Sequence, residues 1–170
     1  MTNDRVLRVL AVSIAVLGLN PVAAHAQMSD ACASFTVSAG DERSVEYLDQ
    51  GDEGPSPGDL RIGRRALVDE SGNTVGYHRW VLINLDAPPG SGDRSEYYGN
   101  HVLNLDDEGQ IYYQVLAEVV GPPENTEQAS TGDYTGVVVG GTGAYSFARG
   151  TVVRSFDGVK GTFAVEIRCD

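Results

Sequence analysis

The sequence predicts an all-β fold, an eight-stranded antiparallel up-and-down barrel that follows a signal peptide. After Ala26, no apolar pattern with the i, i+3, i+4, i+7 spacing of an amphipathic helix is long enough to predict one. Runs rich in β-branched and aromatic residues recur instead, separated by turns rich in glycine, proline and aspartate. A meander of this length closes into a barrel because closure removes its exposed edges. A two-sheet sandwich is the alternative.

The first residues have the features of an export signal. Arg5 and Arg8 form a basic start, and residues 9–19 are an apolar run too short to span a bilayer. The small residues at 24 and 26 predict cleavage after Ala26. We therefore expect a secreted or periplasmic protein, with a signal peptide at 1–26, an N-terminal strap at 27–43 and a barrel domain at 44–170. Within the strap, residues 33–37 are a short alternating run that is compatible with either a strand or a strap.

The charge balance excludes two classes of partner. Removal of the signal peptide takes away Asp4, Arg5 and Arg8, which leaves 10 lysines and arginines against 23 aspartates and glutamates, a formal charge of −13. Such a surface repels phosphate backbones and anionic lipids, so we expect no nucleic-acid or membrane partner. Residues 106–109, Asp-Asp-Glu-Gly, fit an acidic hairpin turn and lack the spacing of an EF-hand calcium loop.

Cys32 and Cys169 lie at opposite ends of the mature chain. In an oxidising compartment an even pair predicts a disulfide, and the long separation is unlike a redox-active Cys-x-x-Cys motif. In an eight-stranded up-and-down barrel the first and last strands are neighbours, so the pair would join the two ends of the sheet.

The first half of the domain is expected to form four strands. The alternation in 44–49 places Val45, Tyr47 and Asp49 on one face, and the glycine- and proline-rich residues 51–58 then form a loop. Turn residues at 70–73 and 87–93 bound the next strands. The eight expected strands are residues 44–49, 60–68, 74–85, 96–105, 110–120, 134–139, 148–156 and 161–169.

The second half depends on one hairpin at 137–153, VVVGGTGAYSFARGTVV. Valine runs flank three glycines, Gly140, Gly141 and Gly143, which predict a strand, a tight glycine corner and a returning strand. A phosphate-binding loop is excluded because no Lys-Ser or Lys-Thr pair and no amphipathic helix follow the glycines.

The phrase Val-Val-Gly-Gly-Thr-Gly-Ala-Tyr-Ser-Phe-Ala-Arg-Gly at 138–150 resembles the signature hairpin of plant dirigent proteins and the matching segment of allene oxide cyclases. Residues 58–60 and 109–111 are also similar to that family, and the resemblance covers about residues 44–167. It implies a barrel with an apolar cavity that forms dimers or trimers. Members cyclise unstable epoxides, direct radical coupling or guide cycloadditions of polyketides, and a disulfide between the chain ends is familiar from dirigent proteins.

The resemblance also implies site residues. Ser56-Pro57 matches a Ser-Pro pair that lines the cyclase pocket, and Tyr47 stands where the cyclases have a glutamate on the first strand. In dirigent proteins an aspartate on the first strand and the arginine of the Ala-Arg-Gly phrase belong to the pocket. The matching residues here are Asp49 and Arg149.

A barrel cyclase needs an enclosing cavity that orients the substrate and one or two acids or cations that stabilise charge. Besides the expected catalytic pair Asp49 and Arg149, the residues of suitable chemistry for binding are Tyr47, Ser56, Pro57, Trp80, Tyr113 and Glu118. Tyr47, Trp80 and Tyr113 also suit plain core packing, and Asp49 and Arg149 also suit structural bracing. We expect no metal site, no bound cofactor and no covalent nucleophile, because zinc-ligand spacing and a Gly-x-Ser-x-Gly elbow are lacking.

Three functions follow from this sequence. The first is a cyclase or isomerase, homo-oligomeric, that acts on a small hydrophobic substrate. The second is a lipocalin-like carrier of a lipophilic molecule, and the third is a structural barrel filled by its own side chains. An empty cavity inside the barrel would distinguish the enzyme and the carrier from the filled structural barrel. An ionisable group facing that cavity would favour the enzyme over the carrier.

Overall fold

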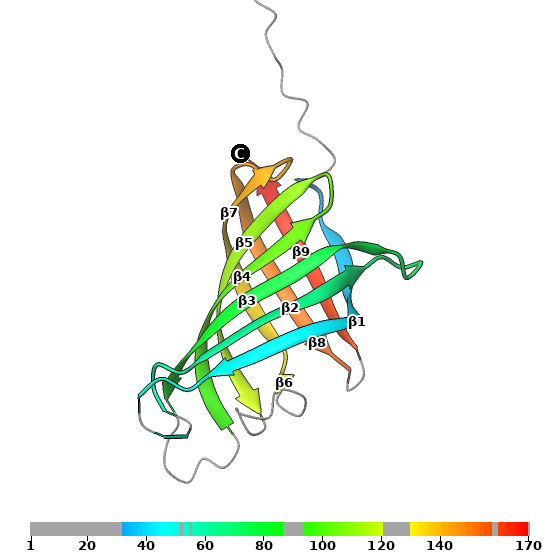
Figure 1. The fold of residues 1–170 in the computed structure, drawn as a ribbon. Helices are drawn as coiled ribbons and strands as arrows, with labels where there is room; N and C mark the ends of the chain where they lie inside the picture. The colour runs from blue at the N-terminus through cyan, green and yellow to red at the C-terminus, as the bar shows by residue number, and fades with distance from the viewer. Residues whose placement is uncertain are drawn as a thin grey trace, which may run out of the picture.

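The computed structural model describes residues 32–169 apart from 52, 55, 87–93, 121–129 and 158–159. The strands of this part of the chain are shown in Figure 1. They are β1 Phe35–Leu48, β2 Leu60–Val68, β3 Thr74–Asp86, β4 Arg94–Leu105, β5 Gly109–Val120, β6 Ser130–Thr131, β7 Tyr134–Gly143, β8 Ala148–Phe156 and β9 Gly161–Cys169. The expected signal peptide lies outside the described residues. Among those residues no helix is long and apolar enough to cross a membrane.

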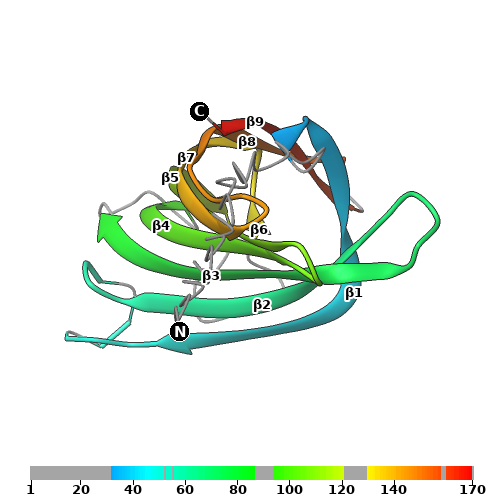
Figure 2. The ribbon, with the colours of Figure 1, turned by 90° about the horizontal axis from the view of Figure 1, so that it is seen from above.

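Eight of the strands close into one antiparallel barrel, which is seen end-on in Figure 2. The order around the barrel is β1-β2-β3-β4-β5-β7-β8-β9, and β9 pairs with β1 to complete the ring. The two-residue strand β6 adds only to the end of β5. The all-β barrel is therefore confirmed, and the sandwich alternative is excluded.

A disulfide joins Cys32 to Cys169, with the two Cα atoms 5.8 Å apart. The pairing of Phe35 with Val165 places the start of β1 beside the C-terminal half of β9, so the two cysteines meet at one end of the barrel. We refer to this end as the disulfide end. The predicted disulfide is confirmed, and it is compatible with an oxidising compartment outside the cytoplasm.

Strand β1 begins at Phe35, well before the expected start at residue 44. Phe35–Ser38 pair with β9, and β1 pairs with β2 from Ser38 to Leu48, with a register shift between Ala39 and Arg43. Such a bulge bends the strand and locally interrupts its ladder. Because the bulge interrupts the alternation of apolar residues, the sequence suggested a separate strap here.

The glycine-rich hairpin also differs from the expectation. Strand β7 continues through the glycines to Gly143, and residues 144–147 form the turn. The glycines pair with the start of β5, Gly141 with Ile111 and Gly143 with Gly109. A Cβ atom at Gly141 would lie 2.4 Å from the Tyr145 carbonyl oxygen, so the close approach of the returning chain requires glycine at that position.

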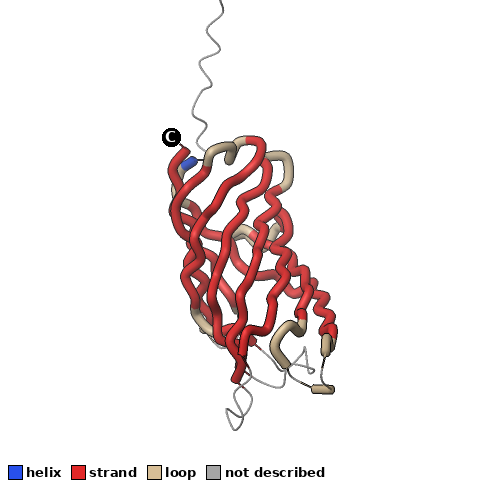
Figure 3. Tube along the Cα trace, turned by 90° about the vertical axis from the view of Figure 1, so that its left-hand side faces the viewer, coloured by secondary structure: helices blue, strands red, loops and turns tan. Residues whose placement is uncertain are grey.

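Figure 3 shows the barrel from the side, built of strands along its length. The side chains inside the barrel differ between its two ends. Toward the disulfide end it is packed with apolar side chains, among them Leu67, Leu103, Ile111 and Val165, which are fully buried. In the half away from the disulfide, which we call the distal half, the buried side chains are largely polar or aromatic. They include Arg61, His78, Asn84, Tyr97, His101 and Arg154.

Candidate functional site

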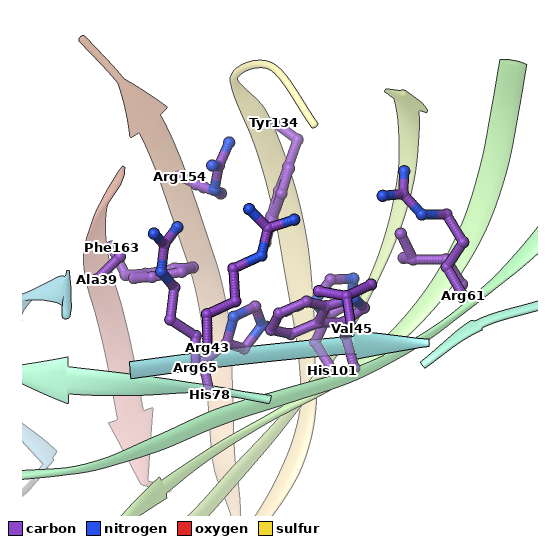
Figure 4. A pocket seen from close by; sticks show the side chains of 12 residues that line it. Ala39, Arg43, Val45, Arg61, Arg65, His78, His101, Tyr134, Arg154 and Phe163 are labelled. Atoms are coloured by element: carbon purple, nitrogen blue, oxygen red, sulfur yellow. Dashed lines mark hydrogen bonds between the residues drawn. The ribbon is translucent and has the colours of Figure 1, made fainter. Parts of the chain in front are cut away.

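A cavity of about 70 Å³ lies inside the distal half of the barrel (Figure 4). Its lining comes from β1, β2, β3, β4, β7, β8 and β9, because alternate residues of each strand point inward. Two imidazoles and three aromatic rings form much of the wall: His78, His101, Trp80, Tyr134 and Phe163. Four arginines complete it: Arg43, Arg61, Arg65 and Arg154. The cavity is therefore not the purely apolar one that the family resemblance implied.

The two imidazoles lie side by side. The His78 Nε2 and His101 Nδ1 atoms are 2.9 Å apart, and the rings are stacked with an interplanar angle of 12°. Neighbouring strands β3 and β4 supply them, in a register that places Trp80 opposite His101. One proton lies between the two nitrogens. When His101 Nδ1 carries this proton and donates it to His78, the neutral His101 ring has a lone pair on Nε2; when His78 is the donor, the His101 proton is on Nε2 instead.

Two tyrosines extend this contact into a chain of polar groups. The Tyr113 hydroxyl lies 2.9 Å from His78 Nε2 and 3.1 Å from the Tyr134 hydroxyl. Burial raises the pKa of Tyr113 well above its ordinary value and that of Tyr134 to about 12. Both phenols are therefore neutral at physiological pH and act as hydrogen-bond donors and acceptors.

The histidines are also neutral. Burial lowers the pKa of His101 to about 3, and the positive charge of Arg154 contributes to the shift. Burial puts the pKa of His78 well below its ordinary value, with smaller contributions from His101, Arg154 and Arg65. Because buried cations are costly in free energy, the pair stays uncharged while the cavity is empty of negative charge.

The Nε2 atom of His101 is buried and has no hydrogen-bond partner in the described part of the chain. Gly99 provides the room for this ring, since a Cβ atom on Gly99 would lie 2.4 Å from that nitrogen. Gly63 similarly makes room for the indole of Trp80, because a Cβ atom on Gly63 would lie 2.1 Å from Cζ2 of that indole. Buried polar atoms are normally satisfied, so an unpartnered imidazole nitrogen beside a cavity indicates a position for a ligand group.

The arginines are the second chemical feature of the cavity. Arg65 Nε donates to the Gly40 carbonyl oxygen at 2.9 Å, and Arg154 Nη1 donates to that of Gly132 at 2.6 Å. Burial lowers the pKa of Arg61 and of Arg65, and the nearby charge of Arg43 lowers both further. None of the described lining residues is acidic.

Three of the residues predicted from sequence meet elsewhere, at the loop between β1 and β2. The fully buried Asp59 carboxylate accepts hydrogen bonds from the Tyr47 hydroxyl at 2.6 Å and from the Ser56 amide and hydroxyl at 2.6 and 3.2 Å. Burial raises the pKa of Asp59, but these hydrogen bonds outweigh it and the pKa lies below its ordinary value. Tyr47 and Ser56 thus hold a structural acid, and Pro57 is exposed beside them.

Two further predicted residues, Trp80 and Tyr113, do belong to the cavity region: Trp80 lines it, and Tyr113 contacts His78. Asp49, Arg149 and Glu118 are exposed and do not line it. Asp49 follows β1 at the distal end, whereas Arg149 is the second residue of β8, at the disulfide end. The structure therefore does not bring the expected catalytic pair together, and its role stays a prediction.

Sequence reasoning missed the imidazole pair and the four arginines. The histidines were considered only as metal ligands, and no three His, Cys, Asp or Glu side chains cluster among the described residues. A signal was present in the alternation Arg61-Gly63-Arg65 and His78-Trp80-Leu82, which places cations and rings on the same strand face as Leu67.

Comparisons with known proteins bear on the fold. No protein-family model matches the chain, and no curated protein sequence matches it. Among solved structures the barrel is similar to pyocyanin demethylase, with a TM-score of 0.57 and 22% sequence identity over 79% of this chain and 99% of that one. The resemblance to dirigent proteins and allene oxide cyclases stays a prediction, and what the comparison shows is that this chain shares its barrel fold with pyocyanin demethylase.

Proposed function

We propose that the protein holds a small organic molecule in the distal cavity and moves a proton on it through His101, as an isomerase or cyclase without a metal or bound cofactor. The observation that supports this most directly is the buried Nε2 atom of His101, which has no partner among the described residues and belongs to a ring that lines the cavity. A neutral imidazole in that position is suited to general acid–base chemistry.

The proposed step conserves protons. The lone pair on His101 Nε2 takes a proton from an acidic C–H or O–H of the bound molecule, while the Nδ1 proton of His101 shifts toward His78 Nε2, 2.9 Å away. Return of a proton from His101 Nε2 to another atom of the same molecule completes an isomerisation or a ring closure. Most of the acceleration would come from the enclosed orientation of the substrate.

The volume of the cavity limits how much of a ligand it can enclose. About 70 Å³ is more than the space of one water but far below the roughly 300–1,000 Å³ of pockets that enclose a drug-sized ligand. The cavity therefore holds one end of a molecule. Arg43 lines the cavity and is exposed, so the rest of a longer ligand would lie beside this side chain, outside the enclosed space.

The comparison supports small-molecule chemistry in this fold. A barrel of similar structure is named for the demethylation of pyocyanin, and we extend to this chain only a reaction on a small molecule. The aromatic rings of Trp80 and Phe163 in the wall suit a planar, apolar body.

Deuterium exchange tests the proposal without knowledge of the natural substrate. The protein is incubated in heavy water with a panel of small unsaturated ketones, phenols and carboxylic acids, and incorporation at carbon is followed by mass spectrometry. We expect exchange in a subset of the panel, a loss of at least tenfold in His101→Gln, and no loss in Asn100→Gln on the outer face of the same strand. Binding without exchange in any compound would indicate a carrier instead.

A further inference from the structure

We propose that the ligand of the distal cavity is an organic anion with a planar body, and that Arg43, Arg61, Arg65 and Arg154 bind its carboxylate or a similar oxyanion. This inference rests on the proposed function in one respect, because it places the ligand in the same cavity. It adds the chemical class of that ligand, which neither the fold nor the sequence resemblance supplies.

The placement of charge in the molecule is the first argument. The chain has 24 acidic residues against 12 lysines and arginines, yet four of its arginines line one small cavity. No acidic side chain is among the described lining residues. A protein that repels anions over its surface thus gathers positive charge at one internal position, which concentrates an anion there.

Burial is the second argument. Arg61 is 4% exposed and Arg154 is 7% exposed, and burying a guanidinium is costly unless it is compensated. The Nε atom of Arg61 is buried and has no hydrogen-bond partner within the described residues. The charge of Arg43 contributes to lowering the pKa values of Arg61 and Arg65, and that of Arg154 to lowering the pKa of Arg65, so a bound anion would offset repulsion between these neighbouring cations.

Two of the guanidinium groups are held in position. Arg65 and Arg154 each donate to a backbone carbonyl oxygen, and the Arg154 guanidinium lies 5.7 Å from the centre of the Tyr134 ring. In Figure 4 the side chains of Arg43, Arg65 and Arg154 gather above His78, and Arg61 lies farther along the cavity. A fixed guanidinium fork matches the planar geometry of a carboxylate.

The rings beside the arginines favour an organic anion over an inorganic one. The His78 ring centre is 4.9 Å from that of Trp80 and 4.8 Å from that of Phe163. An inorganic oxyanion would fill the arginine cluster and leave these ring faces without a partner. A conjugated or aromatic acid would contact the arginines with its carboxylate and the ring faces with its planar body.

Such a ligand would also act on the imidazoles. The charge of Arg154 is among the causes that keep both histidines neutral, so an anion bound to Arg154 counteracts that effect. The ligand would thereby strengthen the base that acts on it. Anion binding and proton transfer would then be coupled through one arginine.

Four probes of similar size test the proposal by isothermal titration calorimetry at low ionic strength: benzoate, its neutral isostere benzamide, its cationic isostere benzamidine, and sulfate. We expect benzoate to bind at least tenfold more tightly than benzamide and benzamidine. Sulfate should compete with benzoate but bind more weakly, because it cannot use the ring faces. Equal binding of benzoate and benzamide, or tighter binding of sulfate, would overturn the inference.

Arginine variants locate the site. We expect Arg61→Gln to weaken benzoate binding at least tenfold, and Arg43→Gln, which changes an exposed side chain and is therefore safe for folding, to weaken it several-fold. Arg79→Gln on the outer face of β3 is the matched control and should leave binding unchanged. Equal affinities in folded Arg43→Gln, Arg61→Gln and Arg79→Gln proteins would contradict the site.

The two proposals fail separately. Benzoate binding through the arginines without deuterium exchange in any tested acid leaves the anion site in place and removes the proposed proton transfer. Exchange confined to neutral ketones and phenols, with Arg61→Gln as active as the wild type, supports the proton transfer and overturns the anion site.

Discussion

At the scale of single residues, the distal cavity depends on histidines that the fold keeps uncharged. His101 is 3% exposed and His78 is 5% exposed, and each is within reach of positive charge rather than of a carboxylate. A neutral histidine in this state is a weak base with a lone pair available, and nearby negative charge would make it a stronger one. The charges of the neighbouring residues therefore determine how readily each histidine accepts a proton.

The neutral histidines predict how stability depends on pH. Each pKa is depressed on folding, so the unfolded chain binds more protons below pH 6.5 and stability falls as the pH decreases through that value. The expected loss from His101 is about 2.5 kcal/mol between pH 7 and pH 4.5, and His78 adds a loss in the same direction. Urea unfolding at these two pH values measures it.

The variant His101→Gln serves as the control for this pH dependence. It removes the His101 imidazole, so about 2.5 kcal/mol of the loss should disappear in the same pH range. An unchanged difference between pH 7 and pH 4.5 in the variant would show that His101 is protonated in the folded protein.

At the scale of elements, the sequence identified most strands closely, and β2, β8 and β9 begin and end where they were expected. The exceptions have physical causes, a bulge in β1 and a hairpin whose glycines pair with β5. The site was harder to predict because the outer barrel face also carries apolar residues, such as Leu116 and Val137, 58% and 60% exposed. When both faces are apolar, alternation alone does not tell which one faces inward.

The loop between β1 and β2 is an element whose stability is testable. Asp59 accepts hydrogen bonds from Tyr47, Gln50 and Ser56, so Asp59→Asn leaves buried donors without an acceptor. We expect a loss of about 1–3 kcal/mol in the free energy of unfolding, measured with urea at pH 7.

Asp49→Asn is the matched substitution in the same loop. Its carboxylate is exposed and accepts one hydrogen bond, from the Gly54 amide at 3.0 Å, so we expect a change within about 0.5 kcal/mol. Equal effects of the two substitutions would mean that Asp59 does not organise the loop.

At the scale of the whole molecule, the disulfide fixes the closure of the barrel where β1 meets β9. It spans 137 residues of chain, and closing so long a loop restricts the unfolded state strongly. Its reduction should cost about 2–5 kcal/mol, seen as a lower melting temperature in the presence of a reductant.

The chain has only two cysteines, so a reductant acts on this one bond. Alkylation followed by mass spectrometry shows whether both thiols have been released. An unchanged melting temperature in a fully alkylated sample would mean that strand pairing alone holds the barrel shut.

The packed interior near the disulfide gives the barrel a floor. Because apolar side chains of the described residues fill that half, a ligand of the distal cavity would enter and leave from the side away from the disulfide. In the proposed reaction, substrate and product would share this route, so a product must leave before the next substrate enters. An excess of product should consequently slow the proposed turnover by occupying the route that the substrate needs.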